Sequence, residues 1–87
     1  MIRIPNTLTT SSLDDELVLL DERTGKYFGL NAVGSRIFQL LKETGDPEAV
    51  VAALLAEYEV PEARLRADVS SLVDTLCEKG LLSKDAP

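Results

Sequence analysis

The sequence predicts an α+β fold in which a three-stranded antiparallel sheet is followed by three helices. Two stretches in the first third of the chain are rich in Leu, Val and aromatic residues, a composition typical of strands joined by a hairpin loop. Three later stretches repeat apolar residues at helical spacing and are bounded by capping residues. Because the strands and the helices occupy separate parts of the chain, they are expected to segregate in space.

The strand Glu16–Asp21 is predicted from a short apolar run bounded by charged residues. A loop that ends in Gly25, a residue suited to positive φ, leads into a second strand over Lys26–Leu30. A further strand is expected near Asn6–Ser11, before a turn at Leu13–Asp15. The sheet would then finish on Lys26–Leu30, which would leave that strand as an open edge.

Side chains alternate between the two faces of a strand, so Tyr27 and Gly29 would point to one face and Phe28 and Leu30 to the other. Tyr27 and Phe28 are the only adjacent aromatic residues in the chain. The sequence does not show whether Tyr27 or Phe28 points toward the helices. It also leaves open whether the two aromatic side chains only cover the small core.

The three helices are predicted by their apolar spacing and by their end residues. Asn31 is a suitable N-cap, Asp46 caps the next helix, and Gly45 and Gly80 are suited to follow helix ends. The predicted helices span Ala32–Glu43, Pro47–Tyr58 and Pro61–Lys79. With the hairpin they describe a winged helix-turn-helix-like unit. The expected core residues are Val33, Ile37, Phe38, Leu40, Leu41, Val50, Val51, Leu54, Leu55, Tyr58, Leu65, Val69, Leu72, Val73 and Leu76. Leu81–Leu82 would fold back onto this core, and Ser83–Pro87 would form a loose tail.

The size and charge of the chain exclude several classes of protein. Its 87 residues predict one domain over residues 1–87, with a core over about residues 6–82. The net charge of −6, concentrated after residue 45, opposes binding to nucleic acid or to an anionic membrane. The chain has no signal-like or membrane-spanning apolar run and only one cysteine, Cys77, so a cytoplasmic location is expected.

The residues needed for catalysis are scarce. The absence of histidine removes the commonest general base and metal ligand, and Cys77 has no histidine to activate it. The carboxylates Asp14–Glu16 are typical of a solvated turn, and no glycine-rich phosphate loop is present. The sequence therefore predicts no enzyme activity, no cofactor and no metal, and it favours a binding role.

Two surfaces are candidates for binding. The third helix has the position of a DNA-recognition helix, but its net negative charge opposes contact with phosphates. The edge of the strand Lys26–Leu30 has unpaired main-chain groups and can accept an extended peptide as an added strand. Gly29 would let the backbone of that peptide approach closely. The same edge could instead serve for dimerisation of the chain.

Three segments resemble the PqqD family of peptide-binding modules. They are Leu17–Phe38, with the run Thr-Gly-Lys-Tyr-Phe-Gly-Leu-Asn, Val50–Tyr58, and Ala67–Leu82. The resemblance implies three antiparallel strands followed by three helices, with no catalysis. It also implies that the leader part of a ribosomally made precursor peptide binds between the third strand and the third helix.

Carried onto this chain, the resemblance places the leader along the main chain of Lys26, Tyr27, Phe28, Gly29 and Leu30. The leader's apolar side chains would meet Tyr27 or Phe28 and a helix flank made of Val69, Leu72, Val73 and Leu76. Arg66 and Lys79 could meet acidic leader residues.

The chain resembles discrete leader-binding proteins, with no fused enzyme domain. The partner implied first is a separate leader peptidase of lasso peptide biosynthesis. The alternative is a radical-SAM enzyme of cofactor biosynthesis.

Overall fold

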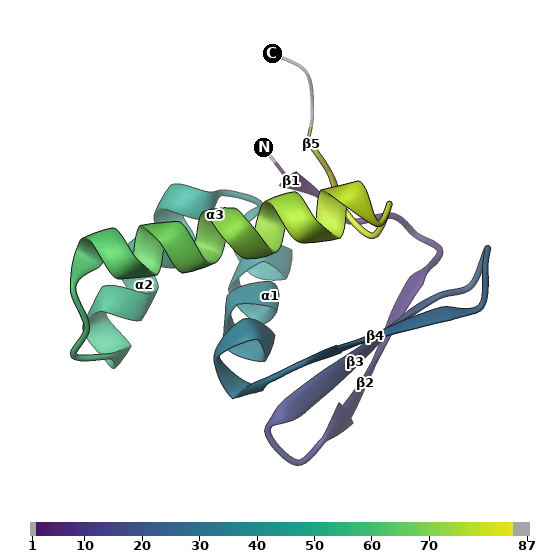
Figure 1. The fold of residues 1–87 in the computed structure, drawn as a ribbon, viewed down its shortest axis with the longest axis horizontal. Helices are drawn as coiled ribbons and strands as arrows, with labels where there is room; N and C mark the ends of the chain where they lie inside the picture. Colours follow the sequence, from purple (N-terminus) through teal and green to yellow (C-terminus); the bar gives the residue numbers. More distant parts are fainter. Residues whose placement is uncertain (1, 85–87) are drawn as a thin grey trace.

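A computed structural model describes residues 2–84 of the chain. A sheet of three antiparallel strands comes first, in the order β2-β3-β4. These strands are β2 (Leu8–Leu13), β3 (Glu16–Asp21) and β4 (Lys26–Leu30). Three helices follow, namely α1 (Ala32–Thr44), α2 (Pro47–Glu57) and α3 (Glu62–Glu78). The predicted α+β fold is confirmed, and α3 runs across α1 and α2 with its end near the sheet (Figure 1).

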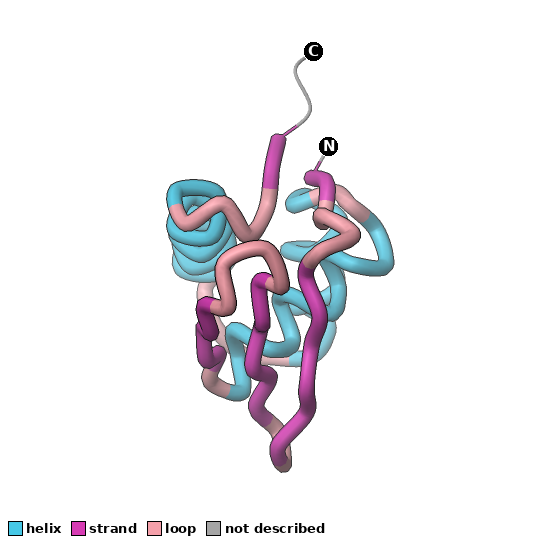
Figure 2. The backbone as a smooth tube through the Cα atoms, turned by 90° about the vertical axis from the view of Figure 1, so that its right-hand side faces the viewer, coloured by secondary structure: helices cyan, strands magenta, loops and turns pink. Residues whose placement is uncertain are grey.

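The sheet packs its inner face against the helices. Leu17, Leu19 and Leu30 on this face are all at most 7% exposed and belong to one core with the buried residues of α1, α2 and α3. Figure 2 shows the three strands side by side, with the end of α3 near one edge of the sheet. An ion pair between Arg36 and Glu57, with 2.6 Å between nitrogen and oxygen, links α1 to α2.

Two short segments near the ends of the described residues form a second, two-stranded sheet that the sequence did not predict. In it, β1 (Ile2–Arg3) pairs antiparallel with β5 (Ser83–Lys84). The expectation of a loose tail from Ser83 is therefore wrong for Ser83 and Lys84, while residues 85–87 lie outside the described residues. Strands of two residues carry no periodic pattern, and only the fold brings these two together.

Several element boundaries and core residues differ from the prediction. The first strand of the main sheet is Leu8–Leu13 rather than Asn6–Ser11, because β3 pairs with it along its whole length. Val33, Leu55 and Tyr58, which were expected in the core, are 39%, 39% and 37% exposed. Helix α2 is apolar on almost every side, so its spacing could not show which side the core would cover. Leu81 and Leu82 are buried as expected.

Candidate functional site

Strand β4 forms a free edge of the three-stranded sheet. Where β3 ends, the Glu22 N–H donates to the Thr7 carbonyl at 2.9 Å, so the main chain of Glu22 points to the β2 side. Successive residues of a strand direct their N–H and C=O groups to opposite sides. The even-numbered residues of β3, like Glu22, therefore face β2, and its odd-numbered residues face the even-numbered residues of β4 with which they pair. This alternation directs the N–H and C=O groups of Tyr27 and Gly29 to the free edge.

The two aromatic residues of β4 lie on opposite faces of the sheet. Phe28 is half-buried against the core, whereas Tyr27 is 73% exposed on the outer face. The Nζ atom of Lys79 lies 5.4 Å from the centre of the Phe28 ring, a distance typical of a cation–π interaction. Phe28, and not Tyr27, is therefore the aromatic residue that faces α3.

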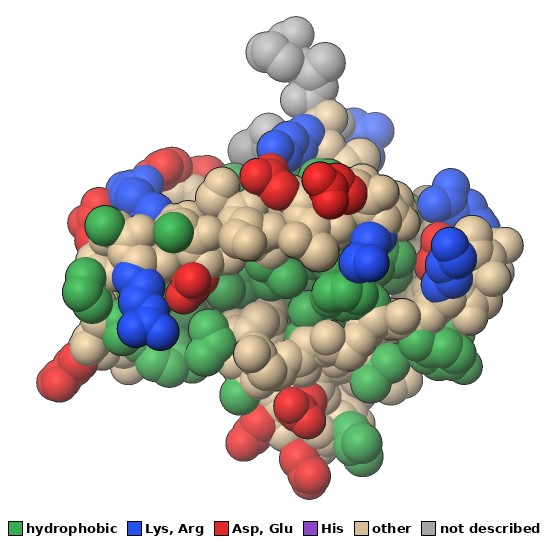
Figure 3. All heavy atoms as spheres, viewed as in Figure 1, with side chains coloured by type: hydrophobic (Ala, Val, Ile, Leu, Met, Phe, Trp, Pro, Cys, Tyr) green, Lys and Arg blue, Asp and Glu red, His purple; other side chains and the backbone are tan. Residues whose placement is uncertain are grey.

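Helix α3 and β4 border a groove with hydrophobic side chains inside it (Figure 3). Leu72 and Lys79, seven residues apart, lie on the same flank of α3. Leu72 is half-buried, whereas Val69, Val73 and Leu76 are at most 3% exposed. The half-buried Leu72 and Phe28 can therefore contact a ligand directly, while the three buried residues support the floor.

Arg66 lies on the other flank of α3, toward α2. Its guanidinium forms ion pairs with Glu48 at 2.7 Å and with Glu62 at 2.8 Å. The hydrogen bonds that Arg66 donates to these carboxylates, that to Glu48 first, raise the pKa of Arg66 above its ordinary value. The structure thus places Arg66 apart from the β4 residues with which the sequence analysis grouped it, whereas it brings Lys79 to them.

Two polar residues at the start of α1 fix the position of β4. The Asn31 side chain accepts a hydrogen bond from the Gly34 N–H at 2.8 Å and so caps α1, as predicted. The buried Ser35 hydroxyl accepts a hydrogen bond from the Leu17 N–H at 2.8 Å and donates one to the Leu30 carbonyl at 3.2 Å. Sequence reasoning missed Ser35, because a serine in the first turn of a helix gives no sign that it bridges two strands.

The loop between β3 and β4 is tied to the end of α3 by Arg23. The Arg23 guanidinium donates to the Gly80 carbonyl at 3.4 Å and to the Asp21 carboxylate at 3.4 and 3.5 Å. The Arg23 main-chain N–H donates to the same carboxylate at 3.0 Å. Burial would raise the pKa of Asp21, but the hydrogen bonds and charge of Arg23 outweigh it and hold that pKa below its ordinary value.

A cavity of about 200 Å³ opens where this loop, β4 and α3 meet. Its lining includes the cationic side chains of Arg23, Lys26 and Lys79 beside the Phe28 ring. Figure 3 shows blue side chains over the end of α3 and over the nearby hairpin. This end of the groove is therefore cationic and partly apolar.

A larger cavity of about 460 Å³ lies between α2, α3 and the β1–β5 pair. Its lining includes Arg66 and Lys84, which are already paired with Glu48 and with Asp74. Arg66 and Lys84 at its rim are therefore already paired, and no residue of β4 lines this cavity.

Residues 2–84 contain no group of three or more His, Cys, Asp or Glu side chains close enough to hold a metal ion. Cys77, the free thiol of the chain, is half-buried beside the core. Within the same residues, no helix combines the length and the apolar character needed to cross a lipid bilayer.

Comparison with known proteins gave one family and two solved structures of similar fold. Residues 16–82 match the family described as coenzyme PQQ synthesis protein D (PqqD). A structure described as TbiB1 in complex with the TbiA(beta) leader peptide is 42% identical over 98% of this chain and 99% of that chain, with a TM-score of 0.89. A lasso peptide synthetase B1 complexed with the leader peptide is 32% identical over 95% of this chain and 98% of that chain, with a TM-score of 0.86. The search of curated proteins gave no match.

Proposed function

This chain belongs to the PqqD family, and on that basis we propose that it binds the leader region of a precursor peptide without catalysing a reaction. The observation that carries the proposal is the free edge of β4 beside an apolar groove. An extended peptide can add to such an edge as a further strand. Its main chain would bond the outward N–H and C=O groups of Tyr27 and Gly29.

Alternate side chains of the bound leader would point into the groove. An added strand continues the pleat of the sheet, so every second side chain lies on the helix-facing side, level with Phe28 and Leu30. Apolar leader residues there would contact Phe28 and Leu72 above the floor formed by Val69, Val73 and Leu76. The intervening leader side chains would lie on the outer face beside Tyr27.

Gly29 supports the proposed contact because the fold itself does not require a glycine there. A Cβ atom built at Gly29 meets no other atom within 4 Å, and Gly29 has no positive φ. We therefore assign Gly29 a role in peptide binding. The backbone of the peptide can approach an edge residue more closely when that residue has no side chain.

The pathway of the proposed carrier is lasso peptide biosynthesis. One of the two similar structures is named as a lasso peptide synthetase B1, which favours this pathway over presentation of a precursor to a radical-SAM enzyme. In the cytoplasm, the chain would hold the leader and deliver the precursor to a separate leader peptidase. The supporting feature is that an added strand on β4 leaves the rest of the precursor free to reach an enzyme.

Binding is tested by fluorescence anisotropy with the labelled TbiA(beta) leader peptide as the probe. We expect a dissociation constant between micromolar and nanomolar, which corresponds to about −8 to −12 kcal/mol. The variant Gly29→Val should weaken binding at least ~10-fold while the melting temperature stays close to that of the original chain. Equal binding by this variant would exclude a close approach of the peptide at Gly29.

Strand addition itself is tested by methylating single main-chain nitrogens of the same peptide. Alternate residues of an added strand direct their N–H groups to β4, so methylation should abolish binding at every second position. Methylation at the intervening positions, which leaves these bonds intact, is the matched control. A loss of binding without this alternation would contradict strand addition.

Delivery is tested with a leader peptidase and its full-length precursor. Adding this chain should raise kcat/KM for leader removal, and the Gly29→Val variant should raise it less. If both forms leave cleavage unchanged while binding is normal, the chain binds leaders but does not present them to that peptidase.

A further inference from the structure

We propose that the groove selects a peptide with an acidic side chain at the end near the β3–β4 loop, two residues from an apolar side chain that contacts Phe28. The inference rests on the proposed function and adds the chemistry of the ligand at one position. It is drawn from the distribution of charge around the groove.

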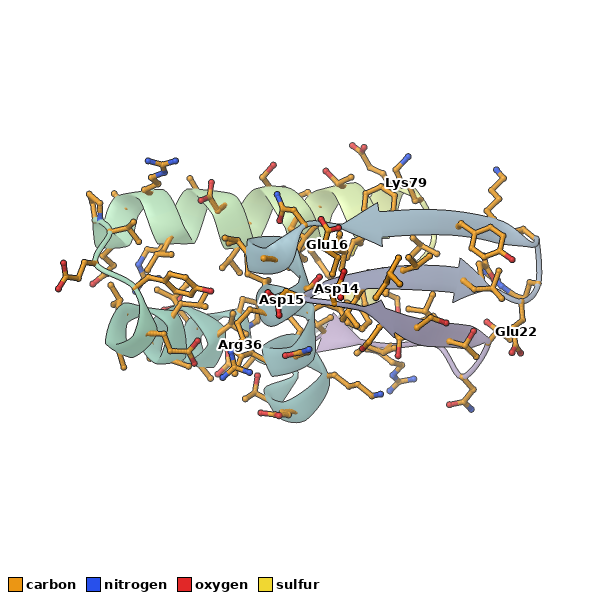
Figure 4. All side chains as sticks on the ribbon, turned by 90° about the horizontal axis from the view of Figure 1, so that it is seen from below. Asp14, Asp15, Glu16, Glu22, Arg36 and Lys79 are labelled. Carbon is orange, nitrogen blue, oxygen red and sulfur yellow. The ribbon has the colours of Figure 1, made fainter. Side chains whose placement is uncertain are left out.

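The lining of the cavity at the loop end of the groove is mainly cationic, although the chain as a whole carries a net charge of −6 and Glu22, in the same loop, lies outside this lining (Figure 4). Arg23, Lys26 and Lys79 all line the cavity at this end, and Asp21 is the one carboxylate in its described lining. The Asp21 carboxylate is already bonded to Arg23. Within residues 2–84, neither Lys26 nor Lys79 forms an ion pair with a carboxylate, so both ammonium groups remain available to a ligand.

The opposite end of the sheet has the opposite charge. Asp14, Asp15 and Glu16 gather at the turn between β2 and β3, and the chain reverses there close to the end of β4 at Leu30 (Figure 4). Residues 2–84 contain no ion-pair partner for these three carboxylates. An acidic peptide residue is therefore attracted to the loop end of β4 and repelled from the other end.

The spacing of the ligand follows from the pleat of the strand. Lys26 and Phe28 are two residues apart on the same face of β4, a separation of about 7 Å along the strand. An added strand has the same repeat, so a side chain opposite Phe28 and another opposite Lys26 are also two residues apart. The Lys79 ammonium, which lies 5.4 Å from the centre of the Phe28 ring, is placed to contact both peptide side chains.

The experiment selects ligands from a display library of short random peptides with the chain as bait. We expect enriched peptides to share an apolar residue and an Asp or Glu two positions away. One enriched peptide is then synthesised with its acidic residue or with the matching amide. By anisotropy, the amide form should bind about 3- to 10-fold more weakly, a difference that shrinks as salt rises.

The variant chain Lys26→Met/Lys79→Met should bind the acidic and amide peptides equally, whereas Lys42→Met, on the far side of α1, should keep the difference. Enriched peptides without an acidic preference would overturn this inference and leave the proposed function standing. A difference that persists in the double variant would also overturn it. If no peptide is enriched and the TbiA(beta) leader peptide does not bind, the proposed function fails together with this inference.

Discussion

At the residue scale, two buried polar side chains hold the candidate edge in place. Ser35 is 2% exposed and joins the main chains of β3 and β4 through one hydroxyl group. Asp21 is 4% exposed and holds the turn of the hairpin through Arg23. Both residues fix the position of β4, and we assign neither of them a contact with the ligand. Their substitution therefore tests the stability of the fold that supports the site.

We expect Ser35→Ala to lower the free energy of unfolding by about 1–3 kcal/mol, because it leaves the Leu17 N–H and the Leu30 carbonyl without their buried partner. Urea denaturation measures this change. Ser71→Ala, at an exposed position of α3, is the matched control and should change stability by less than about 0.5 kcal/mol. Equal stability of the two variants would show that the Leu17 N–H and the Leu30 carbonyl find other hydrogen-bond partners when the Ser35 hydroxyl is removed.

Acid should weaken the hairpin through Asp21. Because the folded-state pKa of Asp21 lies below its ordinary value, its ionised form stabilises the fold above pH ~4, and this stabilisation is lost as the pH falls through the folded-state pKa. The variant Asp21→Asn should therefore show a smaller loss of stability between about pH 4 and pH 2. Thermal melts over this range measure it, and parallel pH curves for the two forms would contradict the assignment.

At the scale of the element, the helix-facing side of β4 serves both the core and the groove, and α3 has a half-buried flank beside its buried stripe. On β4, Phe28 faces α3 and Tyr27 faces outward, so the substitution of Tyr27 tests the outer face and not the groove. On α3, Leu72 is the half-buried apolar residue beside the buried stripe. Leu72 is therefore the residue at which binding can be changed with little change in the core.

We expect Leu72→Ala to weaken binding of the TbiA(beta) leader peptide by about 5- to 30-fold, which corresponds to the loss of about 1–2 kcal/mol of apolar contact. Leu55→Ala makes the same chemical change at an exposed position of α2 and should leave affinity unchanged. Isothermal titration calorimetry measures both. Similar losses in the two variants would place the peptide elsewhere or indicate a general loss of structure.

At the scale of the whole molecule, the open edge of β4 makes self-association the main alternative use of this surface. The chain is acidic, with a sequence pI of about 4.5, and like charges oppose the pairing of two copies. Sedimentation equilibrium without peptide should therefore give the monomer mass of 9.5 kDa, and a leader peptide should add one copy per chain. A peptide-free dimer that the peptide dissociates would show that the edge pairs with itself.

Short-range patterns in the sequence were enough to predict three strands followed by three helices, the strand Lys26–Leu30, the caps Asn31 and Asp46 and the alternation of Tyr27 and Phe28, because all of these depend on neighbours within a few residues. Packing in three dimensions was needed to show that Phe28 faces α3, that Arg66 lies toward α2, that Ser35 bridges two strands and that Ile2–Arg3 pairs with Ser83–Lys84. Each of these depends on the direction in which an element packs against residues distant in the sequence. Local periodicity shows which residues share a face of a helix or strand. Which part of the protein that face contacts depends on how the helices and strands pack together.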